Sequence, residues 1–273
     1  AQIGRSHEQH RAVFVGQTTA DLHQQLERFG RGESWRELHR GNPSQPPKVA
    51  FLFSGLGSQH VGMGRELFEG EPAYRAAFEE CEAAAGDFLA QPLREILYPA
   101  SPNDSGIDDP LCAQISLFAL EYALAQLWRS WGIRPTALIG HSLGEYTAAC
   151  LAGVFSLSDG IKLVAARGRL THEMGRNGKM VAILADSHRV EEAWKGYETV
   201  VSIAAVNAPE QVVISGLADA VDTVVVRLSD AGVFTRPLPV AHAFHSPLVE
   251  TVLADFRRVA GEIAFSAPRK RLI

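Results

Sequence analysis

Residues 137–144 have the sequence ALIGHSLG, and this stretch decides the fold. Its first three residues form a short apolar run that predicts a buried strand, and the alanine-rich segment that follows predicts a helix ending near residue 152. Between them lies a G-x-S-x-G pattern, whose two glycines allow the sharp turn that raises a serine hydroxyl above a sheet. The order of strand, turn and helix is that of a nucleophile elbow with Ser142 as the nucleophile. In the alternative interpretation, Ser142 is only the N-cap of a helix.

A second apolar run, residues 48–53, predicts another buried strand. Residues 54–58, SGLGS, end this strand in a tight turn because they contain two glycines. Apolar residues at helical spacing predict helices over residues 72–86 and 113–131. Together with the elbow, these elements indicate a large α/β unit built around a buried sheet.

Residues 178–241 have a different pattern, in which six short elements follow one another. They are predicted as strand, helix, strand, strand, helix and strand over residues 180–185, 189–194, 199–206, 211–215, 217–231 and 233–240. This β-α-β-β-α-β order is typical of a ferredoxin-like unit. We therefore predict an α/β protein in which a ferredoxin-like small subdomain, residues 178–241, is inserted into a large subdomain made of residues 48–177 and 242–273.

The N-terminal segment, residues 1–47, ends in the proline-rich sequence NPSQPP, which neither a helix nor a central strand tolerates. Before it we predict a strand over residues 12–15 and a helix over residues 19–29. The proline-rich stretch is the expected domain boundary. Because the chain starts with alanine and stops in an extended stretch, we expect it to be part of a longer protein.

The overall composition excludes several classes of protein. The 273 residues are 46% hydrophobic and 21% charged, which is typical of a folded globular protein and not of a disordered or fibrous one. A net charge of -5 argues against nucleic-acid binding. We find no apolar run that predicts a membrane span and no secretion signal. Cys81, Cys112 and Cys150 lack the spacing of a metal site and fit a reducing, cytoplasmic environment.

A nucleophilic serine needs a base, and three of the ten histidines are candidates. His141 adjoins Ser142 along the backbone and is poorly placed to turn its ring onto that side chain. His242 and His245 follow the last predicted strand of the small subdomain, where the chain is expected to cross back to the large one. This crossing predicts that one of these two histidines lies over the elbow.

Five motifs occur here in the order seen in the acyltransferase domains of modular type I polyketide synthases. They are FSGLGSQHVGMG from Phe53, GHSLGEY from Gly140, VAARGRL from Val164, AAVNAPEQVVISG from Ala204 and HAFHSP from His242. From about residue 47 to its end, the chain resembles these domains and, more generally, malonyl-CoA:acyl carrier protein transacylases. The resemblance implies an α/β-hydrolase-like large subdomain and a ferredoxin-like small one. It also implies that residues 1–47 are similar to the linker between a ketosynthase domain and an acyltransferase domain.

The reaction of this family implies roles for two residues. Ser142 corresponds to the nucleophile and His245 to its base in a ping-pong reaction. An acyl group moves from coenzyme A to the serine and then to the phosphopantetheine thiol of an acyl carrier protein, without a bound cofactor or metal. In the family, a late main-chain carbonyl orients the imidazole, and we expect that segment to lie beyond Ile273.

The resemblance also assigns an oxyanion hole to two backbone N–H groups, those of Leu56 and Leu143. Most relatives carry glutamine at the position of Leu56, in a GQGSQ pattern where this chain has GLGSQ. Because the donor is a main-chain group, we expect Leu56 to supply it all the same.

The substrate side of the site is implied by further matches to the family. Arg167 stands where the family places a guanidinium that grips the free carboxylate of the substrate. Relatives with HAFH, here beginning at His242, generally use malonyl units, and Phe244 would fill the space that a 2-methyl group needs. Gln114 and Asn207 are further substrate-binding candidates. The resemblance therefore implies malonyl-CoA as substrate, with an acyl carrier protein and an adjacent ketosynthase domain as partners.

Two other functions remain open on the sequence. A serine esterase or thioesterase would share the elbow, the histidine and the two-lobed architecture, although Arg167 and the GLGSQ turn favour a transferase. A non-catalytic, acyltransferase-like docking domain is indicated only by Leu56 and by the end of the chain at Ile273.

Overall fold

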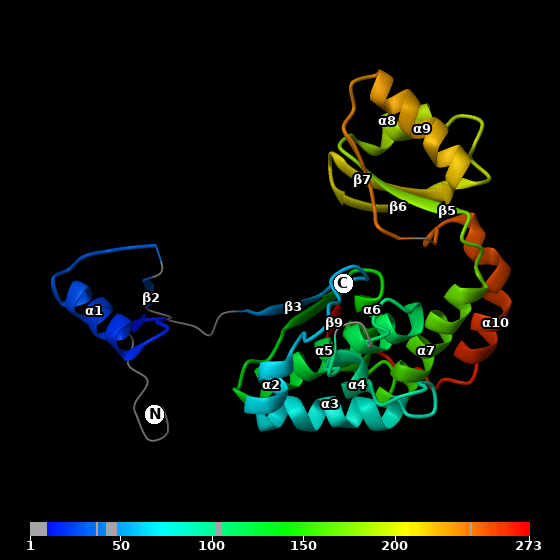
Figure 1. Ribbon diagram of the computed structural model, residues 1–273. Helices are drawn as coiled ribbons and strands as arrows, with labels where there is room; N and C mark the ends of the chain where they lie inside the picture. Colours follow the sequence, from blue (N-terminus) through cyan, green and yellow to red (C-terminus); the bar gives the residue numbers. More distant parts are fainter. Residues whose placement is uncertain (1–9, 37, 42–47, 102–104, 241) are drawn as a thin grey trace. The chain divides into compact units, whose positions relative to one another are not determined.

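The strand that leads into the elbow, β4 (Ala137–Gly140), is the middle strand of a three-stranded parallel sheet. In the computed structural model it lies between β3 (Ala50–Phe53) and β9 (Arg271–Leu272) (Figure 1). The His141 N–H donates to the Phe53 carbonyl oxygen (2.9 Å) just beyond the paired residues. Because β3 and β4 are parallel, the turns that follow them leave the same edge of the sheet side by side.

The structure describes residues 10–36, 38–41, 48–101, 105–240 and 242–273. These residues divide into two compact units, Ala1–Val49 and Ala50–Ile273.

The first unit contains a two-stranded antiparallel sheet and one helix. Its elements are β1 (Arg11–Val13), α1 (Thr19–Gly30) and β2 (His39–Gly41). A capping box between Thr18 and Asp21 starts α1, which agrees with the predicted helix at this place. The rings of Phe14 and Phe29 pack edge to face with centroids 5.3 Å apart.

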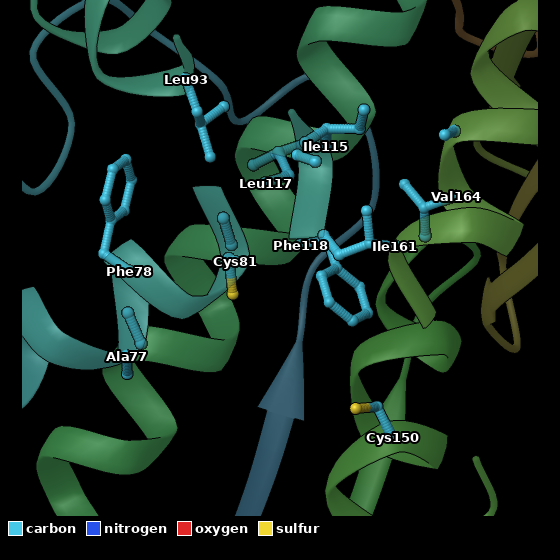
Figure 2. Close-up of a cluster of buried hydrophobic side chains, with 14 of the residues drawn as sticks. Ala77, Phe78, Cys81, Leu93, Ile115, Leu117, Phe118, Cys150, Ile161 and Val164 are labelled. Carbon is cyan, nitrogen blue, oxygen red and sulfur yellow. The ribbon is translucent and has the colours of Figure 1, made fainter. Parts of the chain in front are cut away.

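Helices surround the parallel sheet of the second unit and form its main core. They are α2 (Arg65–Gly70), α3 (Pro72–Ala85), α4 (Leu93–Leu97), α5 (Pro110–Ser130), α6 (Gly144–Ala152), α7 (Leu157–Glu173), the 3-10 helix η2 (Pro247–Val249) and α10 (Glu250–Ala260). Figure 2 shows the apolar cluster in which Phe78 of α3, Phe118 of α5 and Ile161 of α7 meet, all of them fully buried. This cluster holds the helices that carry the site residues in place.

Helix α5 lies at the centre of this core. It begins three residues before the predicted start, because the Asp109 carboxylate caps it by accepting from the N–H groups of Leu111 (2.9 Å) and Cys112 (3.1 Å). Within the described ranges α5 is the one helix long and apolar enough to cross a membrane, yet 61% of its most apolar window is buried inside the protein. Its apolar composition is therefore accounted for by its place in the core.

The small subdomain has its own sheet and its own apolar core. Its elements are β5 (Gly178–Ile183), α8 (Ser187–Ala193), β6 (Val201–Ala208), β7 (Gln211–Leu217), α9 (Ala218–Asp230) and β8 (Thr235–Pro237). The strands pair antiparallel in the order β6-β7-β5-β8, and both helices cover one face of the sheet (Figure 1). The predicted α/β class with a ferredoxin-like insertion is thus confirmed. Strand β8 is shorter than predicted, and Pro239 cannot extend it because proline has no N–H to donate.

The glycines of the elbow are held against backbone atoms. A Cβ added to Gly140 would lie 2.2 Å from the Glu145 nitrogen, and one added to Gly144 would lie 2.4 Å from the Phe53 carbonyl oxygen. Neither neighbour is a flexible side chain that could move aside. The two glycines are therefore required by the close approach of β3, β4 and α6.

We expect Gly144→Ala to lower the free energy of unfolding by about 1–3 kcal/mol, because its methyl group would overlap the backbone of β3. Gly86→Ala is the matched control, since Gly86 has helical backbone angles and its added Cβ would find no atom nearer than 3.6 Å. This control should be neutral or stabilising by up to about 1 kcal/mol. Urea unfolding followed by circular dichroism measures both variants. A Gly144→Ala protein as stable as the parent would contradict the tight packing of the elbow.

Candidate active site

A cleft of about 630 Å³ opens at the edge of the parallel sheet where β3 and β4 end. The turns after those two strands form one wall, and strands of the small sheet form the opposite one. The cleft is lined by Gly55, Leu56, Gly140, His141, Ser142, Glu145, Tyr146, Arg167, Met180, Ala182, Ala204, Ala205, Asn207, Val213, Leu238, Val240, Phe244 and His245. It therefore lies between the two subdomains and draws residues from both.

Ser142 stands in the elbow in a strained backbone conformation. Its φ is 52°, and His245 has a φ of 57°; in the part of the chain that the structure describes, these are the two non-glycine residues with positive φ. Such a conformation costs about 1–3 kcal/mol and persists only where the surroundings enforce it. The two residues meet, with Ser142 Oγ lying 2.8 Å from His245 Nε2. The structure thus brings together the predicted nucleophile and the predicted base, which are 103 positions apart.

The backbone of His245 is held in place by a hydrogen bond from the small subdomain. The Ser202 hydroxyl of β6 donates to the His245 carbonyl oxygen (2.7 Å), so a strand of the small subdomain fixes the residue. Ser246 accepts from the Leu248 N–H and starts η2, which ends the turn that carries the imidazole. Burial lowers the pKa of His245 below its ordinary value, and the Arg167 guanidinium and His141 act in the same direction. The ring is therefore neutral, and able to accept a proton, at neutral pH.

The predicted oxyanion donors are the backbone N–H groups of Leu56 and Leu143. Leu143 follows Ser142 directly, and Leu56 lines the cleft from the turn after β3. Within the described ranges, neither N–H donates to a protein acceptor. A Cβ added to Gly55 would lie 3.0 Å from the His141 ring, which shows how closely the two turns pack. The Leu56 side chain packs against the main apolar core, so the leucine that replaces the family's usual glutamine has a structural place.

Arg167 reaches the site from α7. Its Nη1 donates to the side-chain amide oxygen Oε1 of Gln114, and its Nη2 lies 3.4 Å from Ser142 Oγ. Its guanidinium carbon lies 5.4 Å from the centre of the Phe244 ring, in a cation–π contact. Gln114 is fully buried, is not among the residues that line the cleft, and is joined to it by its hydrogen bond with Arg167. Burial lowers the pKa of Arg167, but the group stays charged because its ordinary pKa is so high.

The remaining two predicted residues differ in their placement. Asn207, at the exposed end of β6, lines the cleft. His242 lies outside the set of residues that line it and is buried with its ring centre 6.0 Å from that of Phe244. Contact between His242 and a bound ligand is therefore indirect, through Phe244. The HAFH motif does not reveal in the sequence which of its side chains face the cleft.

Several residues of the cleft were not identified from the sequence. Tyr146 and Glu145 follow the elbow by one turn of α6, and Met180, Ala182 and Val213 face the cleft from the small sheet. Helical spacing from Ser142 was a usable signal for Tyr146, which lies four residues on. The strand residues had no such signal in the sequence, because the same apolar residue types line the core of a protein and the wall of a cleft.

Comparisons with known proteins identify the family of this chain. The acyl transferase domain family matches residues 50–272. Polyketide synthase GfsB of Streptomyces halstedii is 43% identical over 266 residues, which are 97% of this chain and 5% of that protein. The acyltransferase domain from the second module of the salinomycin polyketide synthase is similar in structure, with a TM-score of 0.88 and 43% identity over 97% of this chain and 62% of that one.

A more distant relative is an acyl carrier protein S-malonyltransferase from Vibrio cholerae, with a TM-score of 0.74 and 32% identity over 83% of this chain and 74% of that one. The chain spans about a twentieth of the length of the first curated relative and somewhat less than two thirds of the salinomycin domain. The family match covers both subdomains and every residue of the cleft. The chain therefore belongs to the acyl transferase domain family, as an acyltransferase domain of the modular type I polyketide synthase kind.

Proposed function

We propose that this acyltransferase moves a malonyl group from coenzyme A to Ser142, and then to the phosphopantetheine thiol of an acyl carrier protein. The observation that carries the proposal is the surroundings of Ser142 Oγ, which lies 2.8 Å from His245 Nε2 and 3.4 Å from Arg167 Nη2. A base at the first distance supports nucleophilic attack. A guanidinium at the second supports a substrate whose carboxylate is close to its reacting carbonyl.

The size of a malonyl group fits the separation of these groups. In a malonyl thioester, one methylene group separates the carboxylate from the reacting carbonyl carbon. With that carbon about 3 Å from Ser142 Oγ, the carboxylate would be within hydrogen-bonding reach of Arg167. An acetyl group has no charge to pair with the guanidinium. The Phe244 ring, which packs on Arg167, supports a small malonyl group over one with a 2-alkyl branch.

In the first half-reaction, His245 Nε2 takes the Ser142 hydroxyl proton while Oγ attacks the thioester carbon. This requires the imidazole tautomer with its proton on Nδ1. The carbonyl oxygen becomes an oxyanion, which the N–H groups of Leu56 and Leu143 would stabilise. When the C–S bond breaks, the coenzyme A sulfur receives the proton from His245, and malonyl-serine remains.

In the second half-reaction, the phosphopantetheine thiol of the carrier protein enters the same cleft. His245 takes the thiol proton, and the sulfur attacks the ester carbon of malonyl-serine. The oxyanion forms in the same place as before. Breaking the C–O bond returns the proton to Ser142 Oγ, so the enzyme ends in its starting state.

The remaining assignments concern the longer protein. Residues 1–47 are proposed to be the linker from an adjacent ketosynthase domain, and the likeness to polyketide synthases supports this. The carrier protein as partner is supported by the name of the Vibrio cholerae relative, an acyl carrier protein S-malonyltransferase. A cytoplasmic location is part of the same proposal.

We expect Ser142→Ala to abolish loading from malonyl-CoA, because no second nucleophile stands in the elbow. Intact mass spectrometry should show a gain of about 86 Da, one malonyl group bound as an ester, on the parent and none on the variant. Ser215→Ala, a buried serine of the small sheet, is the control and should load normally. A malonyl ester on the Ser142→Ala protein would contradict the assignment. Rapid release of free malonate without carrier loading would identify a hydrolase.

Arg167→Ala should reduce malonyl loading by about 10- to 150-fold, the cost of losing a charge-assisted hydrogen bond. Loading of acetyl groups should fall much less, because they do not use the guanidinium. Arg169→Ala is the matched control, since Arg169 lies two residues further along α7 and is exposed. Single-turnover loading from malonyl-CoA and acetyl-CoA measures the preference. Equal losses for both acyl groups would mean that Arg167 serves folding instead.

The reactivity of Ser142 should follow the protonation of His245. Because the pKa of His245 is lowered, its neutral form persists to lower pH, and the rate should rise with pH through a midpoint below about 6.5. Phenylmethylsulfonyl fluoride reports this cleanly, since the reagent has no titrating group. Arg167→Ala should move the midpoint upward by removing a nearby positive charge, whereas Arg169→Ala should not. A parent midpoint above 6.5 would refute the lowered pKa.

A further inference from the structure

A buried carboxylate lies directly behind the site and takes no part in the reaction described above. Glu121, in the middle of α5, is 6% exposed. Its Oε1 accepts from the Ser54 N–H (2.7 Å) and from the Ser54 hydroxyl (3.0 Å), and its Oε2 accepts from the Thr147 hydroxyl (2.9 Å). Ser54 is the first residue after β3, and Thr147 lies in α6. One carboxylate therefore joins the two segments that carry the candidate oxyanion donors.

All three partners are hydrogen-bond donors. A buried carboxylate is costly unless its oxygens are satisfied, and an ionised one can only accept. Burial raises the pKa of Glu121, while its hydrogen bonds with Thr147 and Ser54 lower it. An apolar residue at this position would leave the Ser54 N–H without its acceptor, at the start of the turn that contains Leu56.

The hydrogen bonds continue from Ser54 into that turn. Ser54 Oγ gives its proton to Glu121 and lies 3.1 Å from Ser58 Oγ. The Ser54 proton is already given to Glu121, so Ser58 is the donor in this contact. Its single hydroxyl proton is shared between Ser54 Oγ and the Gly55 carbonyl oxygen, 3.3 Å away. The Gly55 carbonyl and the Leu56 N–H belong to one planar peptide group, so fixing the oxygen fixes the direction of the N–H.

We propose that Glu121 is a positioning residue that sets the Leu56 N–H for the oxyanion, through Ser54 and Ser58. The inference rests on the proposed function, because it assumes that Leu56 and Leu143 stabilise the transition state. The contact of Glu121 with Thr147 extends this role to the second donor, Leu143. Helix α6 begins just after Ser142, so the same carboxylate holds the Leu56 turn and the helix that follows the Leu143 donor. The distance between the Leu56 and Leu143 N–H groups is then fixed by a single buried side chain, Glu121.

The test is single-turnover acylation of the protein by malonyl-CoA, with the rate constant measured as a function of thioester concentration. Glu121→Ala should lower the maximal rate constant by about 10- to 100-fold, because a misplaced donor costs nearly as much as a lost one. The concentration for half-maximal rate should stay within about twofold, since the donor acts on the transition state more than on bound substrate. If Glu121 only stabilised the fold, the maximal rate constant of the folded protein would not fall while the concentration for half-maximal rate stayed the same.

Conservative replacement provides a second readout. In Glu121→Gln the amide oxygen can still accept from Ser54, and the amide N–H can donate to the Thr147 hydroxyl, so the rate should recover to within about fivefold of the parent. Leu117→Ala is the matched control for destabilisation, because Leu117 is buried on the same helix and belongs to the apolar core. It should lower the melting temperature while leaving acylation unchanged at temperatures where the protein is folded.

Ser58→Ala tests the chain of hydrogen bonds at a residue whose loss does not threaten folding, since Ser58 is exposed. Alone it should slow acylation by about 3- to 10-fold, and added to Glu121→Ala it should slow it no further, because both act on one peptide group. Additive losses, or parent-like rates in Ser58→Ala and in folded Glu121→Ala, would overturn the inference. A parent that is never acylated by malonyl-CoA would instead overturn the proposed function, so the two failures are distinguishable.

Discussion

The parallel pairing of β3 with β4 is the constraint on which the site depends. It brings the turn after β3 against the elbow so closely that Gly144 lies beside the Phe53 carbonyl oxygen with no room for a side chain. Ser142 receives its strained backbone from this packing, and Leu56 comes to lie at the same edge of the sheet. Under the proposed function, the Ser142 hydroxyl and the N–H groups of Leu56 and Leu143 are held in place by the fold itself, which is the condition for electrostatic preorganisation.

The proposed catalytic pair, Ser142 and His245, is divided between two separately packed subdomains. Ser142 belongs to the large subdomain, whose core is formed by helices around the parallel sheet, while His245 is fixed by Ser202 from the small sheet. The 2.8 Å contact between them consequently depends on how the subdomains sit on each other. The same arrangement gives the cleft one polar wall, from the elbow, and one largely apolar wall, from the strands. A thioester has both kinds of surface.

Under the proposed function, Arg167 affects both the choice of substrate and the basicity of His245. Its positive charge adds to burial in lowering the pKa of His245, which makes the imidazole a neutral but weak base. Under the proposed function, a malonyl carboxylate would pair with the guanidinium and offset part of that charge. His245 would then become a stronger base when the correct substrate is bound. The cation–π contact with Phe244 and the hydrogen bond to Gln114 keep the guanidinium in place for both purposes.

The sequence by itself determined the strands and turns around the elbow, the small subdomain and some of the helices. The apolar run into the elbow, the glycines at positions 140 and 144 and the β-α-β-β-α-β segment are local patterns, and each was found within a few residues of its true bounds. Local patterns suffice there because strand, helix and turn preferences act between near neighbours. Resemblance to a family, not periodicity, was needed to choose His245 among ten histidines and to single out Arg167.

Tertiary structure alone decided which side chains act together. It placed His242 behind Phe244, joined Gln114 to Arg167, and brought Glu121 to Ser54 across 67 positions and to Thr147 across 26. A glutamate in the middle of an apolar helix carries no mark of its partners in the sequence. The partners are set by the packing of α5 against β3 and α6, because a buried carboxylate is stable only where the fold brings donors to both of its oxygens.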